Sequence, residues 1–456
     1  MVSLAPRRPL GAFTSWSRAQ IQALLMLALV NMSNYMDRAI FAILQQPMKE
    51  DLQLQDWQLG ILSGLAFALF YSLAGIPMAR LAEKFNRVNL LSMALSGWSF
   101  ATAMCGAAFS FVHLALARIA VGAAEGACTP TTHSLISDIF PAKQRGLAMA
   151  WLTTSIPIAQ MIAPLAGGAI AMHFGWRVAF MTVGLPGIAL AIVMWLTMKD
   201  PRESEQRPVA NQVSSRFLPD VKLLFSNRAF ALLFIASMFM GIGVTSTNMF
   251  TASYFLRQYH LSLAEVGMLT AAGMGIAGLI GTFVGGFLAD RFAGAYGRSY
   301  PGICGIGALL ASVFFFITFT RDVWTSAVPF LLLANMSTDL KNGPNFAAAQ
   351  NMAPKHMRAT ASAVLMLGAV ALGGGLGPVI LGTISDAVAS SSFPADFGVF
   401  SEVCRTSDTS SELAAACAKA SAHGLRGGLM APCVGFVIAG TCFLLSARAI
   451  REKLED

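Results

Sequence analysis

Charged residues are scarce in this sequence. Only 12% of its 456 residues are Asp, Glu, Lys or Arg, and 55% are hydrophobic, whereas an ordinary soluble domain has about 25% charged residues. A soluble chain of this length would form about three domains. So few charges could not cover three water-exposed surfaces, which excludes a soluble multidomain enzyme. The apolar composition also excludes a disordered chain.

Residue patterns for metal, nucleotide or nucleophile chemistry are also missing. The sequence has no phosphate-binding loop, nucleophile elbow, zinc motif or nucleotide fingerprint. We therefore expect neither an enzyme nor an ATP-driven pump, and no metal or cofactor. Five of the seven cysteines lie inside apolar runs, where they act as small apolar residues: Cys105, Cys128, Cys304, Cys433 and Cys442.

Long apolar runs dominate what is present. A helix needs about 20 apolar residues to cross the hydrocarbon core of a bilayer, and only helices satisfy their own backbone groups there. The sequence predicts an all-α membrane protein with twelve such helices. Their expected spans are 19–46, 55–80, 88–110, 112–139, 145–172, 176–198, 228–257, 263–289, 299–320, 323–350, 357–389 and 424–448.

The basic residues lie between the apolar runs and form no single patch, so the net charge of +8 does not indicate a nucleic-acid partner. Cytoplasmic loops of membrane proteins are enriched in Lys and Arg. With the N-terminus inside, 21 basic residues fall in inner segments and 7 in outer segments. We therefore expect both termini to be cytoplasmic. The first run lacks a signal-peptide cleavage site, so it should remain as the first helix.

The two halves of the chain repeat each other, and a polar segment separates them. We predict an N-terminal six-helix bundle over 1–198, a cytoplasmic linker over 199–227 and a C-terminal six-helix bundle over 228–456. An offset of 207 carries Gly60 onto Gly267 and Glu83 onto Asp290, and an offset of 214 carries Pro164 onto Pro378. Such parallel repeats form the substrate cavity at their interface, near the middle of the membrane.

The loop between the second and third helices carries a recognisable motif. The segment from Gly75 to Arg87, and its copy Gly286-Phe-Leu-Ala-Asp290-Arg291, resemble a loop motif of the major facilitator superfamily. The first copy departs from the family pattern. The resemblance covers essentially the whole chain and implies a transporter with gate loops. The gate residues that it implies are Arg80, Glu83, Asp290 and Arg291.

The first and fourth helices carry charges where the membrane makes charges costly. Asn31, Asn34, Tyr35 and Arg38 share one helical face, which indicates a lining of water or substrate, and Asp37 lies beside them. Arg118 and Glu125 share a face of the fourth helix, at the same expected depth. Two acids and two arginines could exchange partners when one acid is protonated, as a proton-driven switch requires. A static ion cluster that only joins helices is the alternative.

The segments Asn34-Tyr-Met-Asp37-Arg38 and Arg118-Ile-Ala-Val-Gly122-Ala-Ala-Glu125-Gly126 resemble the spinster branch of that superfamily. The resemblance implies that Asp37 is the proton-responsive acid and Glu125 a second proton or gating site. Arg38 would pair with Asp37 or bind the substrate head group. The implied substrate is an amphiphilic lipid such as a lysophospholipid or sphingosine phosphate. A proton-coupled symporter for a small organic anion remains the alternative, because such symporters look similar at these positions.

Further polar residues are candidates for the cavity wall. Asp339 is the repeat equivalent of Glu125, and with Lys341 it either forms a local neutral pair or contacts an anionic head group. Ala163-Pro164 and Gly377-Pro378 carry the second half of a pattern found in exporters, which favours export over packing alone. Besides the polar face of the first helix, the expected lining is Phe41, Thr129, Thr247, Thr251, Tyr254, Asn335 and Asn342.

Two cysteines differ from the rest. Cys404 and Cys417 lie in a long outer segment, where an oxidising compartment would permit a disulfide. Spacing alone leaves open whether they pair. We expect a monomer in a bacterial inner membrane that binds an amphiphile and protons and no nucleic acid.

Overall fold

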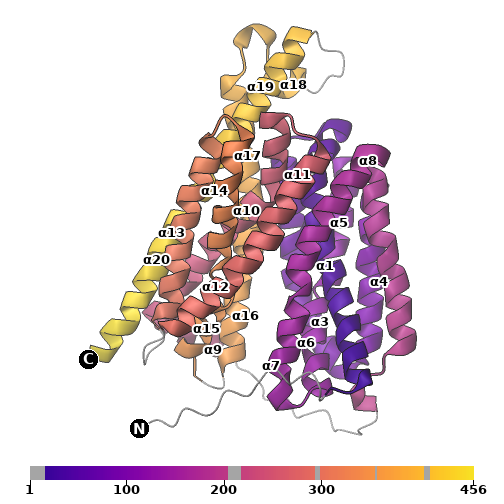
Figure 1. Cartoon of the computed structure of the whole chain (residues 1–456), viewed down its shortest axis with the longest axis vertical. Helices are drawn as coiled ribbons and strands as arrows, with labels where there is room; N and C mark the ends of the chain where they lie inside the picture. The colour runs from indigo at the N-terminus through magenta and orange to yellow at the C-terminus, as the bar shows by residue number, and fades with distance from the viewer. Residues whose placement is uncertain (1–15, 204–216, 293–297, 355–356, 405–410, 456) are drawn as a thin grey trace.

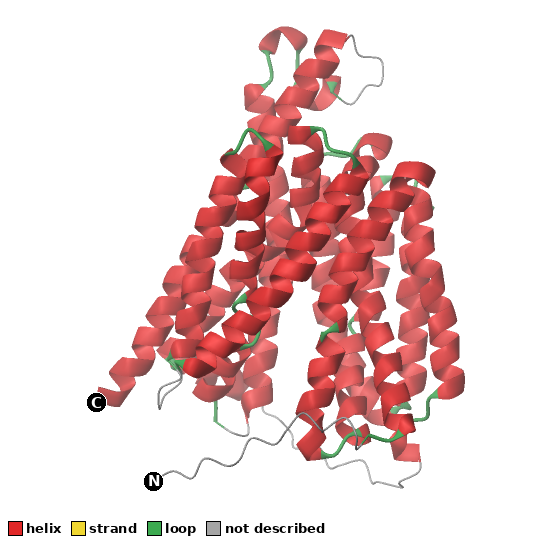
Figure 2. Cartoon of the chain, in the orientation of Figure 1, coloured by secondary structure: helices red, strands yellow, loops and turns green. Residues whose placement is uncertain are grey.

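The computed structural model describes residues 16–203, 217–292, 298–354, 357–404 and 411–455, and within these residues it is helical without strands (Figure 2). The helices run side by side in a long bundle (Figure 1). α1 begins and α20 ends at the lower end of this view, and α19 lies at the upper end. We use "upper end" and "lower end" in this sense below.

Eight helices build the first part of the chain. Glycine separates α2 from α3, and Gly175 interrupts α8 with a φ of 83°, a backbone conformation that favours glycine. This interruption falls between the predicted spans 145–172 and 176–198. The bounds are α1 (Arg18–Leu52), α2 (Asp56–Ser63), α3 (Leu65–Lys84), α4 (Arg87–Gly106), α5 (Phe111–Glu125), α6 (Cys128–Ile139), α7 (Ala142–Thr153) and α8 (Ser155–Thr197).

The rest of the described chain is also helical. Two helices contain π-helical segments rich in small residues, η3 and η5. The elements are η2 (Pro201–Glu203), α9 (Phe217–Ser226), α10 (Arg228–Tyr259), α11 (Leu263–Thr270), η3 (Ala271–Ala277), α12 (Gly278–Arg291), α13 (Ser299–Thr320), α14 (Trp324–Asp339), α15 (Pro344–Met352), α16 (Arg358–Met366), η5 (Leu367–Gly374), α17 (Gly375–Ser392), η6 (Ala395–Phe397), α18 (Phe400–Val403), α19 (Ser411–Gly428) and α20 (Met430–Glu455).

Nine helical segments of the described chain are long and apolar enough to cross a membrane. One of them, Leu147–Thr197, covers two predicted spans. The predicted spans 19–46 and 323–350 form helices but are not among the nine. The first of these carries the polar face expected to line the cavity. The count of twelve membrane-crossing helices stays a prediction. Most of the predicted linker, residues 204–216, lies outside the described part of the chain.

Helices α1–α8 and α10–α20 form two groups that meet through close backbone contacts. A Cβ atom on Gly60 would lie 2.3 Å from the carbonyl oxygen of Pro378, and one on Gly267 would lie 2.5 Å from that of Pro164. Gly168 meets the carbonyl of Leu263 at 2.5 Å in the same way, and Gly382 meets that of Asp56 at 2.3 Å. The sequence repeat relates each contact to its counterpart. Only glycine permits this approach, so the repeated glycines bring the two groups together.

The buried apolar residues form two clusters, which correspond approximately to the two helix groups. One cluster fills the lower part of the first group, with members such as Leu27, Leu91 and Met194. A second cluster begins at Ile40 and Met48 near the upper end of α1 and continues through the second group. At the other end of the chain, the predicted span 424–448 is shifted. The structure ends α19 at Gly428 and begins α20 at Met430, so part of the expected outer segment is helical.

Candidate functional site

The charged residues of α1 and α5 meet inside the first helix group. Arg38 donates to the Oε2 atom of Glu125 from Nη2 at 2.9 Å and from Nε at 3.1 Å. Glu125 is fully buried, whereas the Arg38 side chain is 21% exposed. Arg38 also donates to Asn34 Oδ1 at 3.2 Å. The buried carboxylate of Glu125 is therefore paired with an arginine that is itself partly exposed.

Aromatic rings surround both arginines of this cluster. The Arg38 guanidinium lies 4.7 Å from the ring centroids of Phe67 and Tyr71 and 5.0 Å from that of Tyr35. Arg118 is 1% exposed and lies 4.5 Å from the Phe41 ring and 4.8 Å from the Phe67 ring. Ring faces attract cations without neutralising them. Arg118 therefore has no anionic partner within the described chain, whereas Arg38 has Glu125.

Asp37 has no cationic partner in the described part of the cluster. It is 1% exposed, makes no ion pair within the described residues, and its Oδ2 atom has no hydrogen-bond partner there. Of the two roles expected for Arg38, pairing with Asp37 is wrong for this conformation, and binding of a substrate head group stays a prediction. The two side chains leave neighbouring positions of α1 in different directions, and Arg38 turns towards α5. Arg118 likewise makes no ion pair in the described chain; its Nε donates to the Leu62 carbonyl at 3.3 Å.

Some of the residues predicted to line the cavity in the first group are buried, and others are partly exposed. Asn31 donates to Ser155 Oγ at 2.8 Å and is buried, so it joins α1 to α8 and does not line a cavity. Phe41 is also fully buried, beneath Arg118. Tyr35 and Thr129 are partly exposed, and the hydroxyl of Thr129 lies 3.3 Å from that of Tyr71. The open polar surface therefore centres on Arg38 and its aromatic neighbours.

In the second group, some predicted lining residues border a small pocket and others do not. Thr251 and Asn335 line this pocket together with Asn248, Thr270 and residues of η3. Thr247 is buried and bonds its own helix backbone. The prediction for Tyr254 is wrong, because it is 1% exposed, donates to the Phe319 carbonyl at 3.1 Å and packs on the Phe319 ring.

Asn342 connects the two charges predicted on the tenth span. Its Nδ2 donates to Asp339 Oδ1 at 2.9 Å, and Lys341 Nζ donates to its Oδ1 at 3.0 Å. No direct ion pair joins Asp339 and Lys341 in the described chain. The local neutral pair expected from the sequence is therefore replaced by a bridge through the amide. Lys341 and Asn342 are both at least partly exposed.

Sequence reasoning missed an ion cluster that joins the two helix groups at the upper end. Arg257 of α10 binds Asp56 of α2 with both terminal nitrogens at 2.8 Å, and Lys49 Nζ binds the same carboxylate at 2.6 Å. Ser385 donates to Asp56 at 2.6 Å. Asp386 accepts from the backbone N–H groups of Asp56 and Trp57 at 3.1 and 2.8 Å, which caps the N-terminus of α2.

A second ion cluster ties chain segments together at the lower end. Arg87 is 1% exposed and pairs with Asp200 at 2.5 Å and with Asp138 at 2.7 Å. Arg202 donates to the carbonyls of Ala82 and Glu83 at the end of α3. Burial would raise the pKa of Asp200, but hydrogen bonds from the side chain and backbone of Arg87 outweigh it and hold that pKa well below its ordinary value.

The predicted gate residues lie near this lower end and are exposed. Arg80, Glu83, Asp290 and Arg291 all carry exposed side chains. Asp290 accepts a hydrogen bond from the Tyr300 hydroxyl at 3.0 Å. Glu83 takes part through its backbone carbonyl, which accepts from Arg202. The buried ion pairs at this end therefore join Arg87, the last residue of the first motif segment, to Asp138 and Asp200, and the four residues expected to form a gate take no part in them.

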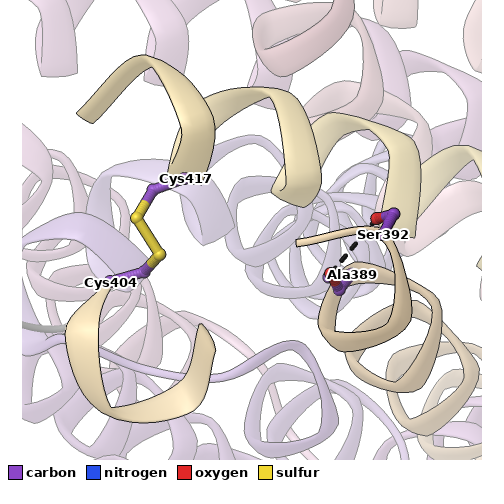
Figure 3. The surroundings of a disulfide bond; sticks show 4 residues. All are labelled: Ala389, Ser392, Cys404 and Cys417. Atoms are coloured by element: carbon purple, nitrogen blue, oxygen red, sulfur yellow. Dashed lines mark hydrogen bonds between the residues drawn. A yellow bond between two sulfur atoms is a disulfide. The ribbon is translucent and has the colours of Figure 1, made fainter. Parts of the chain in front are cut away.

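At the upper end, Cys404 and Cys417 form a disulfide that joins α18 to α19 (Figure 3). Their Cα atoms are 5.6 Å apart. Nearby, the Ser392 hydroxyl donates to the Ala389 carbonyl at 3.1 Å and closes the last turn of α17 (Figure 3). α19 packs along α17. Its Ser421 accepts a 3.3 Å hydrogen bond from Arg257, so the disulfide-bonded segment touches the upper ion cluster.

These features can be compared with known proteins. The model of the Major Facilitator Superfamily matches residues 27–378 of this chain. The chain belongs to the Major Facilitator Superfamily. A crystal structure of a bacterial homologue of the human lysosomal transporter Spinster, in an inward-facing and occupied conformation, has a TM-score of 0.82 with 28% identity. The match covers 95% of this chain and 98% of that one. The resemblance to the spinster branch is confirmed.

Proteins with similar sequences are named as different kinds of transporter. An MFS-type efflux pump of Mycolicibacterium smegmatis is 31% identical over 365 residues, covering 79% of this chain and 83% of the relative. A probable L-galactonate transporter of Escherichia coli is 28% identical over 289 residues, covering 61% of this chain and 63% of the relative. The family and the apolar helices identify a multi-pass membrane transporter, and the cargo has to be argued from the site.

Proposed function

We propose that this chain is a proton-coupled secondary transporter that exports an amphiphilic, lipid-like substrate by alternating access. The observation that carries the proposal is the buried cluster of the first helix group. Glu125 holds Arg38, while Asp37 and Arg118 lie beside them and have no ion-pair partner among the described residues. The cluster contains two acids and two bases, so a proton added to one acid changes which arginine is free.

The proposed coupling follows from this arrangement. When Asp37 holds a proton, it needs no cation, and Arg38 remains on Glu125. When Asp37 loses its proton, a buried carboxylate requires a partner, because a lone charge at this depth is costly. Arg118 or Arg38 then supplies that partner. Exchange of partners moves α1 relative to α5, and such a change between two packed arrangements can bias the whole transporter.

The amphiphile is supported by the surroundings of Arg38. Its guanidinium is partly exposed and keeps a cation available for an anionic head group. Tyr35, Phe67 and Tyr71 surround it with apolar ring surface suited to the adjoining tail. The relative named as an efflux pump supports export. We propose the lysophospholipid or sphingosine-phosphate class.

We further propose that the lower end is cytoplasmic and that this conformation is inward-facing. The ion cluster of Asp56, Arg257 and Lys49 joins the two groups at the upper end. The contacts of the lower cluster that the structure describes stay within the first group. The related bacterial structure with a TM-score of 0.82 is inward-facing. We propose residues 1–198 and 228–456 as the two moving bundles, joined by 199–227.

The substitution Asp37→Asn tests the coupling directly. In proteoliposomes, we expect it to abolish accumulation of radiolabelled sphingosine phosphate driven by a pH gradient. Exchange of labelled for unlabelled sphingosine phosphate should continue, because exchange needs no net proton movement. The matched control is Asp51→Asn, since Asp51 pairs with Arg177 at the exposed upper rim. Gradient-driven accumulation at the wild-type level in Asp37→Asn would remove Asp37 from the proton pathway.

A proton-coupled symporter for a small organic anion is the second candidate. The relative named as a probable L-galactonate transporter favours it, and two amides, Asn248 and Asn335, border the small pocket of the second group. Amide groups and hydroxyls suit a hydroxylated acid. The two candidates differ in cargo and direction. Uptake of galactonate into vesicles with an acidic exterior, with no movement of sphingosine phosphate, would support the symporter.

A further inference from the structure

Three buried hydroxyls of α4, those of Ser92, Ser99 and Thr102, have no hydrogen-bond partner within the described chain, and the last two lie towards α1. Ser99 and Thr102 are each 1% exposed, and neither hydroxyl makes a hydrogen bond within the described chain. Some other buried hydroxyls bond the backbone of their own helix. Ser63 and Thr132 donate to the carbonyl one turn earlier, at 2.8 and 2.6 Å. Because a buried unpaired hydroxyl is destabilising, Ser99 and Thr102 call for a partner outside their own backbone.

Thr102 faces Asp37, the acid whose Oδ2 atom is also unpaired. Ser99 lies one turn before Thr102 on α4, and Ser33 lies one turn before Asp37 on α1. Both serine hydroxyls lie near Gly187 of α8. A Cβ atom on Gly187 would be 2.1 Å from Ser99 Oγ and 3.4 Å from Ser33 Oγ. The absence of a side chain at Gly187 therefore leaves the space in which hydroxyls of α1 and α4 approach each other.

Charged and titratable groups reach Asp37 from the other sides. Arg38 adjoins it on α1, Arg118 and Glu125 face it from α5, and Cys105 lies on α4 beyond Thr102. An arginine favours only the ionised form of a carboxyl group. A hydroxyl differs, because it can donate to a carboxylate and can accept from a carboxylic acid. Thr102 can therefore serve Asp37 in both protonation states.

We propose that Thr102 and Ser99 are positioning residues for proton binding at Asp37. Thr102 hydrogen-bonds Asp37 in both protonation states, and Ser99 keeps the space behind it polar. The pair sets the pH at which Asp37 exchanges its proton and leaves the substrate surface around Arg38 unchanged. This inference rests on the proposed proton coupling at Asp37 and adds residues that neither the family motif nor the charge pattern points to.

The test is the pH profile of sphingosine phosphate transport for Thr102→Val and Ser99→Ala in proteoliposomes. Valine has nearly the shape of threonine but cannot hydrogen-bond. We expect the pH of half-maximal transport to rise by about one unit in Thr102→Val, because ionised Asp37 loses a donor. Ser99→Ala should shift it in the same direction. Thr102→Ser, which restores a hydroxyl, should return the wild-type profile.

Thr132→Val and Ser63→Ala are matched controls, since both remove buried hydroxyls that bond their own helix. We expect wild-type profiles from both. Profiles of Thr102→Val and Ser99→Ala that coincide with these controls would overturn the inference while leaving proton coupling intact. If wild-type protein shows no dependence on the pH gradient, the proposed function fails instead. The two failures are therefore distinguishable.

Infrared spectroscopy can test the contact between Thr102 and Asp37 even if a variant transports too slowly for a pH profile. The infrared C=O band of protonated Asp37 is identified as the carboxylic acid band that is present in the wild-type protein and absent from Asp37→Asn. We expect this band at higher frequency in detergent-solubilised Thr102→Val, because the carboxylic acid group of Asp37 loses a hydrogen bond, and at the wild-type position in Thr132→Val. An unshifted band in Thr102→Val would contradict the contact between Thr102 and Asp37.

Discussion

The substitution Asp56→Asn should release the upper ion cluster and shift the protein away from the conformation described here. Asp56 is 2% exposed and neutralises both Arg257 and Lys49 across the boundary between the two helix groups. Breaking a buried ion pair costs about 3–5 kcal/mol. We take the lower end, about 3 kcal/mol, because asparagine keeps one oxygen that accepts a hydrogen bond. This corresponds to a population shift of about 10²-fold.

The assay is a distance measurement between spin labels at Phe109→Cys and Asp322→Cys, two exposed upper-end positions on different helix groups. We expect Asp56→Asn to move the distribution to longer distances. Asp51→Asn is the matched control, because it breaks an acid–arginine pair whose side chains are 44% and 36% exposed and which lies within one group. Exposed pairs contribute at most about 1 kcal/mol. Identical distributions for the two variants would refute the reasoning.

Three further predictions use the same structure. Gly168→Val should lengthen the spin-label distance, because a Cβ there lies 2.5 Å from a facing backbone carbonyl, whereas Gly302→Val, with nothing within 4 Å, should not. Asp200→Asn should lower thermal stability by about 3 kcal/mol at pH 7. Since the folded pKa of Asp200 is depressed, the wild-type advantage should persist above about pH 4 and be lost as pH falls further, as melting curves against pH will show. Replacing Cys404 and Cys417 by serine should remove about 3 kcal/mol from the segment that they close and speed hydrogen exchange in α19, and unchanged exchange would contradict this.

The fold was largely predictable because its signals are local. Apolar runs long enough to cross a membrane predicted the helices, and the offsets of 207 and 214 predicted the repeat. The repeat also contained information that the sequence analysis did not use. Gly60 and Pro378 touch, as do their counterparts Gly267 and Pro164, so the repeated small residues mark the contact between the two groups. Small residues alone indicate close packing and do not identify the partner.

The sequence indicated the four charged residues that meet in the first helix group, but not how they pair. Arg38 and Glu125 are 87 residues apart, and the choice of Glu125 over Asp37 depends on where the Arg38 side chain points. Asp56 and Arg257 are separated by 201 residues, and both lie near predicted helix ends, where charge is ordinary. Tyr254 shared a face with Thr251, but a helical face can point to a neighbouring helix as well as to a cavity. Long-range pairing and side-chain direction therefore required the structure.

The most direct test of the account is transport by wild-type protein in proteoliposomes whose lumen corresponds to the upper end. Radiolabelled sphingosine phosphate and galactonate are supplied outside, with the lumen acidic, with the exterior acidic, or with both at the same pH. The account predicts accumulation of sphingosine phosphate that requires the acidic lumen and is lost in Asp37→Asn, with no accumulation of galactonate. Transport of sphingosine phosphate at the same rate with and without a pH gradient would contradict proton coupling. Transport of galactonate without transport of sphingosine phosphate would contradict the amphiphilic cargo.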